Sequence, residues 1–340
     1  RPAPPGDPPA GAGELPPPPA EQNPPAQVPP AGTVMIIPDS QLRVLEELAV
    51  YRYLIPRQLI RLGICRSLPY LYTVLRDLES GERPLIRKIE YGVHPTAGRL
   101  AKVLSLTRQG AELLADYRGI APETVFYPRQ HNNPYRNDYF HRTATIDVQI
   151  ELNRFAAASG FALPYFHAYF HKTGANRGAS PHGRLQAMTK VKLASGAIVP
   201  DAIFRLDTVS GQPWLFALEV KNGADTGAAL RQIEGHIRAL EDGALSAHYG
   251  FAQSHRTLFV FARYWHGTEY RSAEGPMYAV MRALAEHSEW AAFLPCFAFT
   301  TLERLTTDVA TEWFYIRDNG VIEQGTNGIF DAGGSSVALR

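Results

Sequence analysis

The sequence of 340 residues predicts an α+β protein with two folded parts behind a proline-rich segment. Three observations predict it. Residues 1–37 are dominated by Pro, Ala, Gly and Gln; residues 38–122 combine short amphipathic helix patterns with two strand patterns; and residues 135–318 contain apolar strands and longer amphipathic helices. Residues 319–340 are expected to form a C-terminal tail.

Composition limits the class of protein. Hydrophobic residues make up 45% of the chain and charged residues 20%, which is enough to bury a core. The two cysteines, Cys65 and Cys296, lie far apart and indicate neither a disulfide framework nor a cysteine zinc site. No apolar run approaches the length of a membrane span. We therefore expect a cytoplasmic protein without a membrane partner.

The proline-rich segment is not expected to fold. Consecutive prolines such as those at 16–19 favour polyproline II and cannot build a packed core. We expect residues 1–37 to be disordered, either as a spacer or as a segment that docks a partner.

Residues 38–122 begin with three predicted helices. Asp39 or Ser40 is expected to cap the first, Pro56 to open the second and Ser67 to cap the third. Two strands and a closing helix follow. The expected helices are 39–49, 56–62, 68–78 and one that opens at Thr107, and the expected strands are 85–91 and 101–106.

This order is the winged helix-turn-helix layout, in which the third helix enters the major groove and the wing touches the backbone. Residues 104–114 are similar to the end of many bacterial winged-helix DNA-binding domains. That resemblance implies base-side contacts from the third helix and phosphate contacts from the wing. The implied DNA-binding residues are Tyr70, Thr73, Arg76, Arg87, Lys88, Arg99 and Lys102. A winged helix that contacts protein is the alternative.

The second folded part carries Pro200-Asp201 in one apolar strand pattern and Glu219-Val220-Lys221 in the next. Side chains alternate in a strand, so Glu219 and Lys221 share a face, and in a hairpin Asp201 can reach the same end. Two carboxylates there would bind Mg²⁺ or Mn²⁺ through oxygen, and the lysine would orient a water or stabilise charge on a phosphate. A structural ion pair without metal is the alternative.

This pattern looks like the motif of the PD-(D/E)XK nuclease superfamily, the restriction-endonuclease fold. The resemblance implies two additional site residues. One is Glu151, within an expected helix at 143–157, and the other is Gln232, on the first turns of an expected helix at 228–240. For each, an ordinary surface role is the alternative. His236, one turn after Gln232, is expected to be exposed.

Residues 39–245 together resemble the replication-relaxation family of plasmids and integrative elements. The resemblance rests on Pro56-Arg57-Gln58-Leu59, the Leu-Thr-x-x-Gly of 106–110, His141 ahead of the Glu151 helix, and Pro200-Asp201 with Glu219. It implies a winged helix joined to a restriction-endonuclease-like α/β domain with a central mixed sheet. Lys221 departs from the family pattern, which is often acidic there, and brings the chain closer to active nucleases.

The predicted function is that of a site-specific relaxase or nickase in plasmid mobilisation or conjugation. Asp201, Glu219 and Lys221, with Glu151 and Gln232, would form the catalytic site, and Asp201 and Glu219 would ligate the metal. The expected partners are double-stranded DNA, at an origin-of-transfer or replication-type site, and accessory proteins of a mobile element. A non-catalytic DNA-binding regulator with a degenerate nuclease fold and a protein-interaction adaptor are the alternatives.

Overall fold

The computed structural model describes residues 37–128, 138–173, 186–317, 320–326 and 328–330. The expected disorder of residues 1–37 falls on residues outside these ranges except at Ile37. The expectation that 319–340 form only a tail is wrong for residues 322–324 and 328–330, which form a strand of the central sheet and a 3-10 helix. Residues Pro38–Arg340 form one compact unit. Within the described ranges, no helix is long and apolar enough to cross a membrane.

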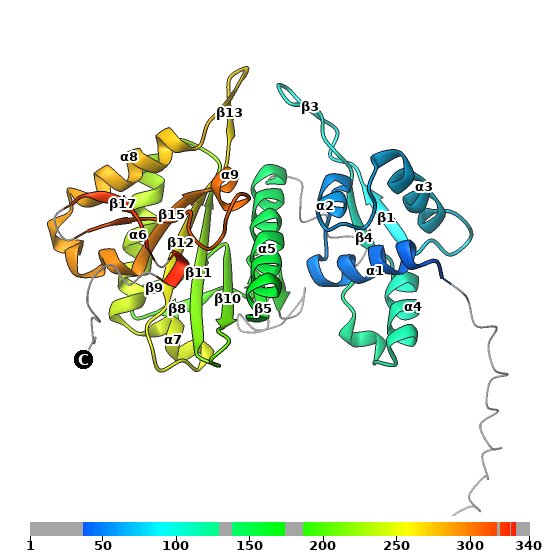
Figure 1. Ribbon diagram of the computed structural model, residues 1–340, viewed down its shortest axis with the longest axis horizontal. Helices are drawn as coiled ribbons and strands as arrows, with labels where there is room; N and C mark the ends of the chain where they lie inside the picture. Colours follow the sequence, from blue (N-terminus) through cyan, green and yellow to red (C-terminus); the bar gives the residue numbers. More distant parts are fainter. Residues whose placement is uncertain (1–36, 129–137, 174–185, 318–319, 327, 331–340) are drawn as a thin grey trace, which may run out of the picture. The chain divides into compact units, whose positions relative to one another are not determined.

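The first folded part contains the helices and strands that the sequence predicts (Figure 1). Leucines that lie at helical spacing in the sequence, such as Leu45, Leu71 and Leu114, are fully buried between these elements. The elements are α1 (Asp39–Tyr51), α2 (Pro56–Arg61), α3 (Leu68–Glu79), β1 (Ile86–Ile89), β4 (Val103–Leu106) and α4 (Arg108–Arg118), with β1 and β4 antiparallel.

Two of the predicted helix caps are wrong. Helix α1 begins at Asp39 itself, after Pro38, whose carbonyl accepts from the backbone N–H of Gln41 at 2.9 Å. Ser67 precedes α3, but its side chain makes no capping hydrogen bond. Thr107 does cap α4, because its hydroxyl accepts from the backbone N–H of Gly110 at 3.1 Å.

The loop predicted between the two strands of the first part holds a further small hairpin. Strands β2 (Val93–His94) and β3 (Gly98–Arg99) pair antiparallel within it. Gly92 and Gly98 have φ angles of 79° and 73°, a region that glycine enters without steric cost. The two glycines therefore let the chain turn into and out of this projecting hairpin.

The second part is built on a seven-stranded sheet in the order β17-β16-β15-β12-β11-β10-β5. Strand β11 pairs parallel with β12 and β12 with β15, whereas the other pairs are antiparallel, so the expected mixed sheet is confirmed. The strands are β5 (Ala162–Ala168), β10 (Ala202–Asp207), β11 (Pro213–Lys221), β12 (Arg256–Phe261), β15 (Phe297–Thr301), β16 (Phe314–Ile316) and β17 (Ile322–Gln324).

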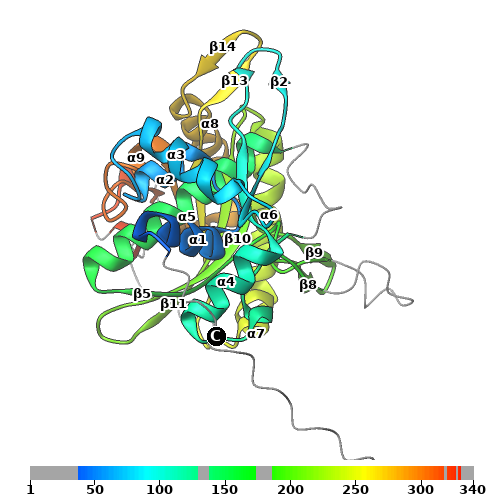
Figure 2. The ribbon, with the colours of Figure 1, turned by 90° about the vertical axis from the view of Figure 1, so that its right-hand side faces the viewer.

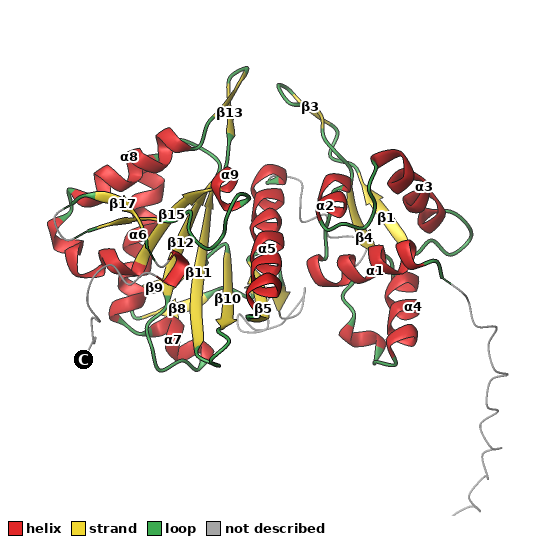
Figure 3. Ribbon diagram, in the orientation of Figure 1, coloured by secondary structure: helices red, strands yellow, loops and turns green. Residues whose placement is uncertain are grey.

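Helices cover both faces of this sheet (Figures 1 and 3). Phe259 and Phe299 point to the face that packs on α6 (Thr226–Glu241) and α8 (Glu274–Ala285). On the opposite face, α5 (Tyr139–Ser159) contacts β5, β11 and α9 (Leu302–Leu305). The strands therefore bury apolar side chains on both faces, which explains why they read as continuous apolar runs.

Helix α5 is longer than predicted. The expected helix at 143–157 begins at Tyr139, so His141 lies in its first turn and not ahead of it. Residues 142–152 are all buried, because α5 has the sheet on one side and polar side chains of α2 on another. An all-round buried helix shows no clear amphipathic stripe, and its start was therefore missed.

Smaller elements complete the described chain. Helix α7 (Ala244–Tyr249) packs on a hairpin of β8 (Val191–Leu193) and β9 (Gly196–Ile198). The other two-stranded pairs are β6 (Lys172–Thr173) with β7 (Gln186–Ala187) and β13 (Tyr264–His266) with β14 (Glu269–Arg271), and the 3-10 helices are Pro122–Thr124, Ser288–Cys296 and Gly328–Phe330.

Candidate active site at the carboxyl end of β11

Asp201 is held at the end of the sheet by the backbone of the neighbouring strand. It directly precedes Ala202, which pairs with Leu218, so it lies at the level of Glu219. Its Oδ2 accepts from the backbone N–H of Val220 at 2.8 Å, and the residue is 7% exposed. The sequence prediction that the Pro-Asp and Glu-x-Lys strands pair as a hairpin is confirmed.

His141 from α5 reaches the same point. Its Nε2 lies 3.0 Å from Asp201 Oδ2 and 3.1 Å from the carbonyl oxygen of Val220, both of which can only accept. Its Nδ1 lies 3.0 Å from the hydroxyl of Tyr169, which donates its proton to Asp138. Both ring nitrogens therefore donate, and the geometry describes an imidazolium.

The electrostatics agree with this assignment. Burial lowers the pKa of His141, but the charge and hydrogen bond of Asp201 outweigh burial and raise that pKa above its usual value. Burial conversely raises the pKa of Asp201, but His141 and then Lys221 bring it below its usual value. The two groups form a buried ion pair.

Glu219 points to the other face of the sheet, toward α6. Its Oε2 accepts from Gln232 Nε2 at 2.8 Å and lies 3.4 Å from Lys221 Nζ, and its Oε1 lies 2.9 Å from His236 Nε2. Gln232 and His236 are four residues apart and therefore share a face of α6. The structure thus brings the predicted Gln232 to Glu219.

The prediction that His236 is exposed is wrong. Its ring is 1% exposed and bonds Glu219. The four-residue spacing between Gln232 and His236 could have predicted this contact. If Gln232 faces a buried carboxylate, the residue one helical turn later faces it too.

Lys221 is within electrostatic reach of both carboxylates. Its ammonium contacts Glu219 and lowers the pKa of Asp201, and its side chain is 14% exposed. Lys221 and His141 line a cavity of about 250 Å³ together with residues 222–225, which lead into α6. Two cations thus line this cavity, whereas Glu219 lines a second cavity of about 290 Å³ with Gln232 and His236.

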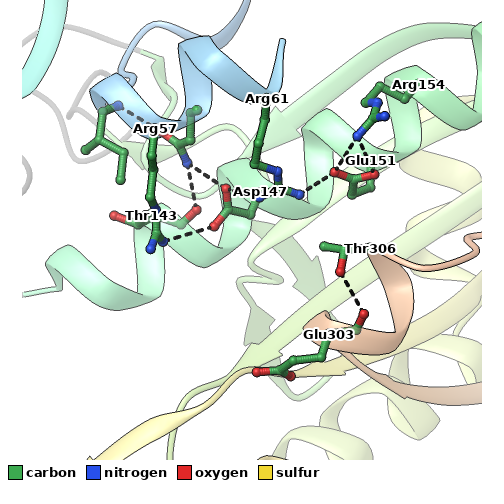
Figure 4. A network of polar contacts seen from close by, with 10 residues as sticks. Arg57, Arg61, Thr143, Asp147, Glu151, Arg154, Glu303 and Thr306 are labelled. Carbon is green, nitrogen blue, oxygen red and sulfur yellow. Dashed lines mark hydrogen bonds and ion pairs between the residues drawn. The ribbon is translucent and has the colours of Figure 1, made fainter. Parts of the chain in front are cut away.

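Glu151 is not brought to this site. It lies ten residues after His141, about 15 Å along a helix that rises about 1.5 Å per residue. Instead it is paired with Arg61 and, at 3.4 Å, with Arg154 (Figure 4). The catalytic role expected for Glu151 is therefore not supported, and His141 is the α5 side chain at the site.

Asp147 is the centre of that polar network between α2 and α5 (Figure 4). Its carboxylate accepts from Arg61 at 2.8 Å, from Gln58 at 3.0 Å and from Arg57 at 3.5 Å. Burial raises the pKa of Asp147 and is only partly offset by Arg61 and Arg57. Helix α2 therefore contacts α5 through polar side chains that bond Asp147.

The predicted DNA-binding residues divide into two groups. Tyr70, Thr73 and Arg76 are exposed along α3, as expected, and Arg99 is exposed in β3. Others have protein partners. Arg87 donates to Ser105 at 3.1 Å, Lys88 is paired with Glu79, and Lys102 is paired with Glu90 at 2.5 Å.

The donors at the site suit a hard cation by type. Asp201, Glu219 and the carbonyl of Val220 offer oxygen, the ligand that Mg²⁺ and Mn²⁺ prefer. In the described part of the chain, however, no group of three or more His, Cys, Asp or Glu side chains is arranged to hold a metal ion. The hydrogen bonds of Asp201 to described residues all go to Oδ2, which leaves Oδ1 as its available ligand atom.

His255 is a buried histidine near His236, and it makes the stability of the fold depend on pH. It is 1% exposed, its Nε2 has no partner among described residues, and its ring lies 5.9 Å from that of His236. Burial, and then His236, lower its pKa to about 3. A folded-state pKa below the unfolded value stabilises the fold above pH about 6.5, and this contribution is lost as the pH falls toward 3.

We expect this histidine to remove about 2 kcal/mol from the free energy of unfolding between pH 7 and pH 5. Urea denaturation of His255→Leu at both pH values should show a correspondingly smaller loss. His248→Leu, at an exposed position, is the control and should keep the wild-type pH dependence. An unchanged pH dependence in His255→Leu would contradict the assignment.

Comparisons of this chain with protein-family models, with curated proteins and with solved structures each find no match.

Proposed function

We propose that this chain is a site-specific, metal-dependent DNA endonuclease, a relaxase or nickase of a plasmid or integrative element. The observation that carries the proposal is that Asp201, Glu219 and Lys221 lie at one end of β10 and β11, where Lys221 contacts Glu219 and lowers the pKa of Asp201. The mixed sheet with helices on both faces fits the restriction-endonuclease-like domain that the sequence resemblance implies.

In this proposal, Asp201 and Glu219 hold Mg²⁺ or Mn²⁺. The cation, when bound, supplies Lewis-acid stabilisation of the scissile phosphate and lowers the pKa of a water. Lys221 adds positive charge at the cavity, where charge develops on the phosphate. Gln232 and His236 fix the orientation of Glu219, and His141 fixes that of Asp201.

Recognition is assigned to the first part, read as a winged helix. Supporting this, Tyr70, Thr73 and Arg76 leave an exposed polar face on α3, and the β2–β3 hairpin follows as a wing with Arg99 exposed. Arg76, whose guanidinium lies 3.5 Å from the Thr73 hydroxyl on this face, would contact base edges or phosphates.

Arg76→Ala is expected to weaken binding to the cognate duplex at least fivefold, because a specific arginine contact contributes about 1–3 kcal/mol. Arg76 is exposed, so folding should be unaffected. Fluorescence anisotropy at fixed salt measures the effect. Arg282→Ala, an exposed arginine in the last turn of α8, is the matched control and should bind as wild type. Equal affinities for both variants would reject the assignment of recognition to α3.

The proposal is tested with supercoiled plasmid that carries the non-coding DNA next to the gene. Mn²⁺ or Mg²⁺ should produce open circular DNA with one nicked strand, and EDTA should abolish the product. A footprint on that DNA without any cleavage, with either metal, would reject the enzyme.

A second candidate function is a DNA-binding regulator with a degenerate nuclease fold. The observation that favours it is that protein groups already engage both carboxylates: His141 binds Asp201, and Gln232 and His236 bind Glu219. The footprint without cleavage is the result that this candidate predicts.

A further inference from the structure

A hairpin projects from the same end of the sheet as the candidate active site. Strand β12 runs parallel to β11, and the backbone N–H of Ala262, just after it, donates to the carbonyl of Lys221 at 2.7 Å. The chain then leaves the sheet as β13 and β14, which form a separate two-stranded pair (Figure 2). The hairpin therefore starts next to Lys221.

One face of this hairpin carries two aromatic rings in contact. Trp265 and Tyr270 are cross-strand partners and therefore point to the same side, with ring centroids 4.9 Å apart. The guanidinium of Arg263 lies 4.5 Å from the centroid of the Tyr270 ring. Tyr270 is 47% exposed, and Trp265 is half-buried. These rings are not part of the apolar core under α6 and α8.

The aromatic row continues through the β2–β3 hairpin to α5. The ring of His94 lies 6.3 Å from Trp265 and 5.2 Å from Phe140. Backbone N–H groups of Thr96 and Ala97 donate to His94 Nδ1 at 3.2 and 3.1 Å, which fixes this ring. Thr96 also donates through its hydroxyl to the carbonyl of Gly267 at 3.0 Å, so the two hairpins touch.

The row ends on α5, one residue before a side chain of the active site. Phe140 is the residue before His141, whose ring bonds Asp201. Tyr270, Trp265, His94 and Phe140, called here the aromatic row, are all exposed or half-buried. The row thus leads from the β13–β14 hairpin to the first turn of α5, next to His141 in the sequence.

The chemistry of the row fits unpaired nucleobases. Exposed aromatic rings accompanied by arginine stack bases of any sequence, and each base contributes about 1–3 kcal/mol. Paired bases in a duplex offer no free face to such rings. Two arginines lie beside the row: Arg263 over the Tyr270 ring, and Arg99 in β3, the strand that pairs with the strand of His94. Their positive charge suits the negatively charged phosphate backbone of a nucleic acid.

We propose that the aromatic row is a binding track for single-stranded DNA, which stacks unpaired bases and leads the strand to Asp201 and Lys221. The proposal deepens the proposed function by naming melted, single-stranded DNA as what reaches that site. The exposed face of α3 would bind the duplex, and the row would bind the strand to be cut.

The test measures binding of a fluorescein-labelled, mixed-sequence 20-nucleotide single strand to the full chain in EDTA, by anisotropy. Trp265→Ala and Tyr270→Ala are each expected to weaken binding about tenfold, and Trp265→Phe to restore most of it, because the ring and not the indole N–H stacks. Tyr117→Ala removes an exposed ring on α4 and is the matched control, with wild-type affinity expected.

A second readout is the quenching of tryptophan fluorescence by the single strand, which should be lost in Trp265→Phe. The proposal is wrong if Trp265→Ala and Tyr270→Ala bind the single strand with wild-type affinity and the quenching of tryptophan fluorescence stays at its wild-type level. The proposal is also wrong if the hairpin variants lose as much affinity for a duplex as for the single strand, because that would show a general duplex contact. Because binding is measured without metal, loss of the proposed nuclease activity alone leaves a positive result intact, and the two proposals fail separately.

Discussion

Lys221→Met is expected to reduce the nicking rate about 100-fold while DNA binding and folding stay close to wild type. The effect follows from the loss of one preorganised positive charge at the cavity where the phosphate would lie. Methionine keeps the apolar stem, which passes near the ring of Phe259, 5.7 Å from the ammonium. Single-turnover nicking of supercoiled plasmid with Mn²⁺ measures the rate.

The control for this charge change is Lys192→Met. Lys192 lies in β8 and is exposed, so its replacement changes net charge equally without touching the cavity. Its nicking rate should equal that of wild type. If Lys221→Met nicks as fast as wild type, Lys221 is only the partner that neutralises Glu219 and Asp201, and the catalytic role proposed for it is lost.

Gly110→Ala is expected to lower the free energy of unfolding by about 3 kcal/mol or more, through overpacking against backbone. A Cβ at this position would lie 2.0 Å from the carbonyl oxygen of Leu85. That oxygen cannot move easily, because it accepts from the backbone N–H of Thr107 at 3.0 Å. Urea denaturation followed by circular dichroism measures the change.

Gly275→Ala is the matched control, since Gly275 lies in the first turn of α8 and its Cβ would meet no atom within 4 Å. Alanine there should be neutral or stabilise by up to about 1 kcal/mol. Equal stability of the two variants would show that the approach of α4 to Leu85 is not tight. The expected loss of stability in Gly110→Ala would also explain the Leu-Thr-x-x-Gly pattern of 106–110 as a helix cap followed by a close backbone contact.

Much of the local structure could be predicted from the sequence. Short-range chemistry determines such features: Thr107 caps α4 within three residues, and alternation along β11 fixes which residues share a face with Glu219. The hairpin of β10 and β11 follows from two apolar strands and a glycine-containing turn, so Asp201 and Glu219 were found at one end of it.

The partners of those carboxylates could not be predicted, because they come from helices distant in sequence. His141 reaches Asp201 across sixty residues, and the helix predicted at 143–157 left it out, because residues buried on every side around 142–152 give no clear signal of where the helix begins. Glu151 was expected at the site, but ten residues of helix separate it from His141, and Arg61 provides its partner.

The sequence by itself therefore determined the helices and strands, the mixed α+β class and the pair Asp201 and Glu219, since these depend on propensity, period and turn chemistry. The tertiary structure alone decided which side chains surround that pair and that Trp265, His94 and Phe140 form one row. Contacts of this kind depend on how helices and hairpins pack in three dimensions, and no spacing along the chain encodes that packing.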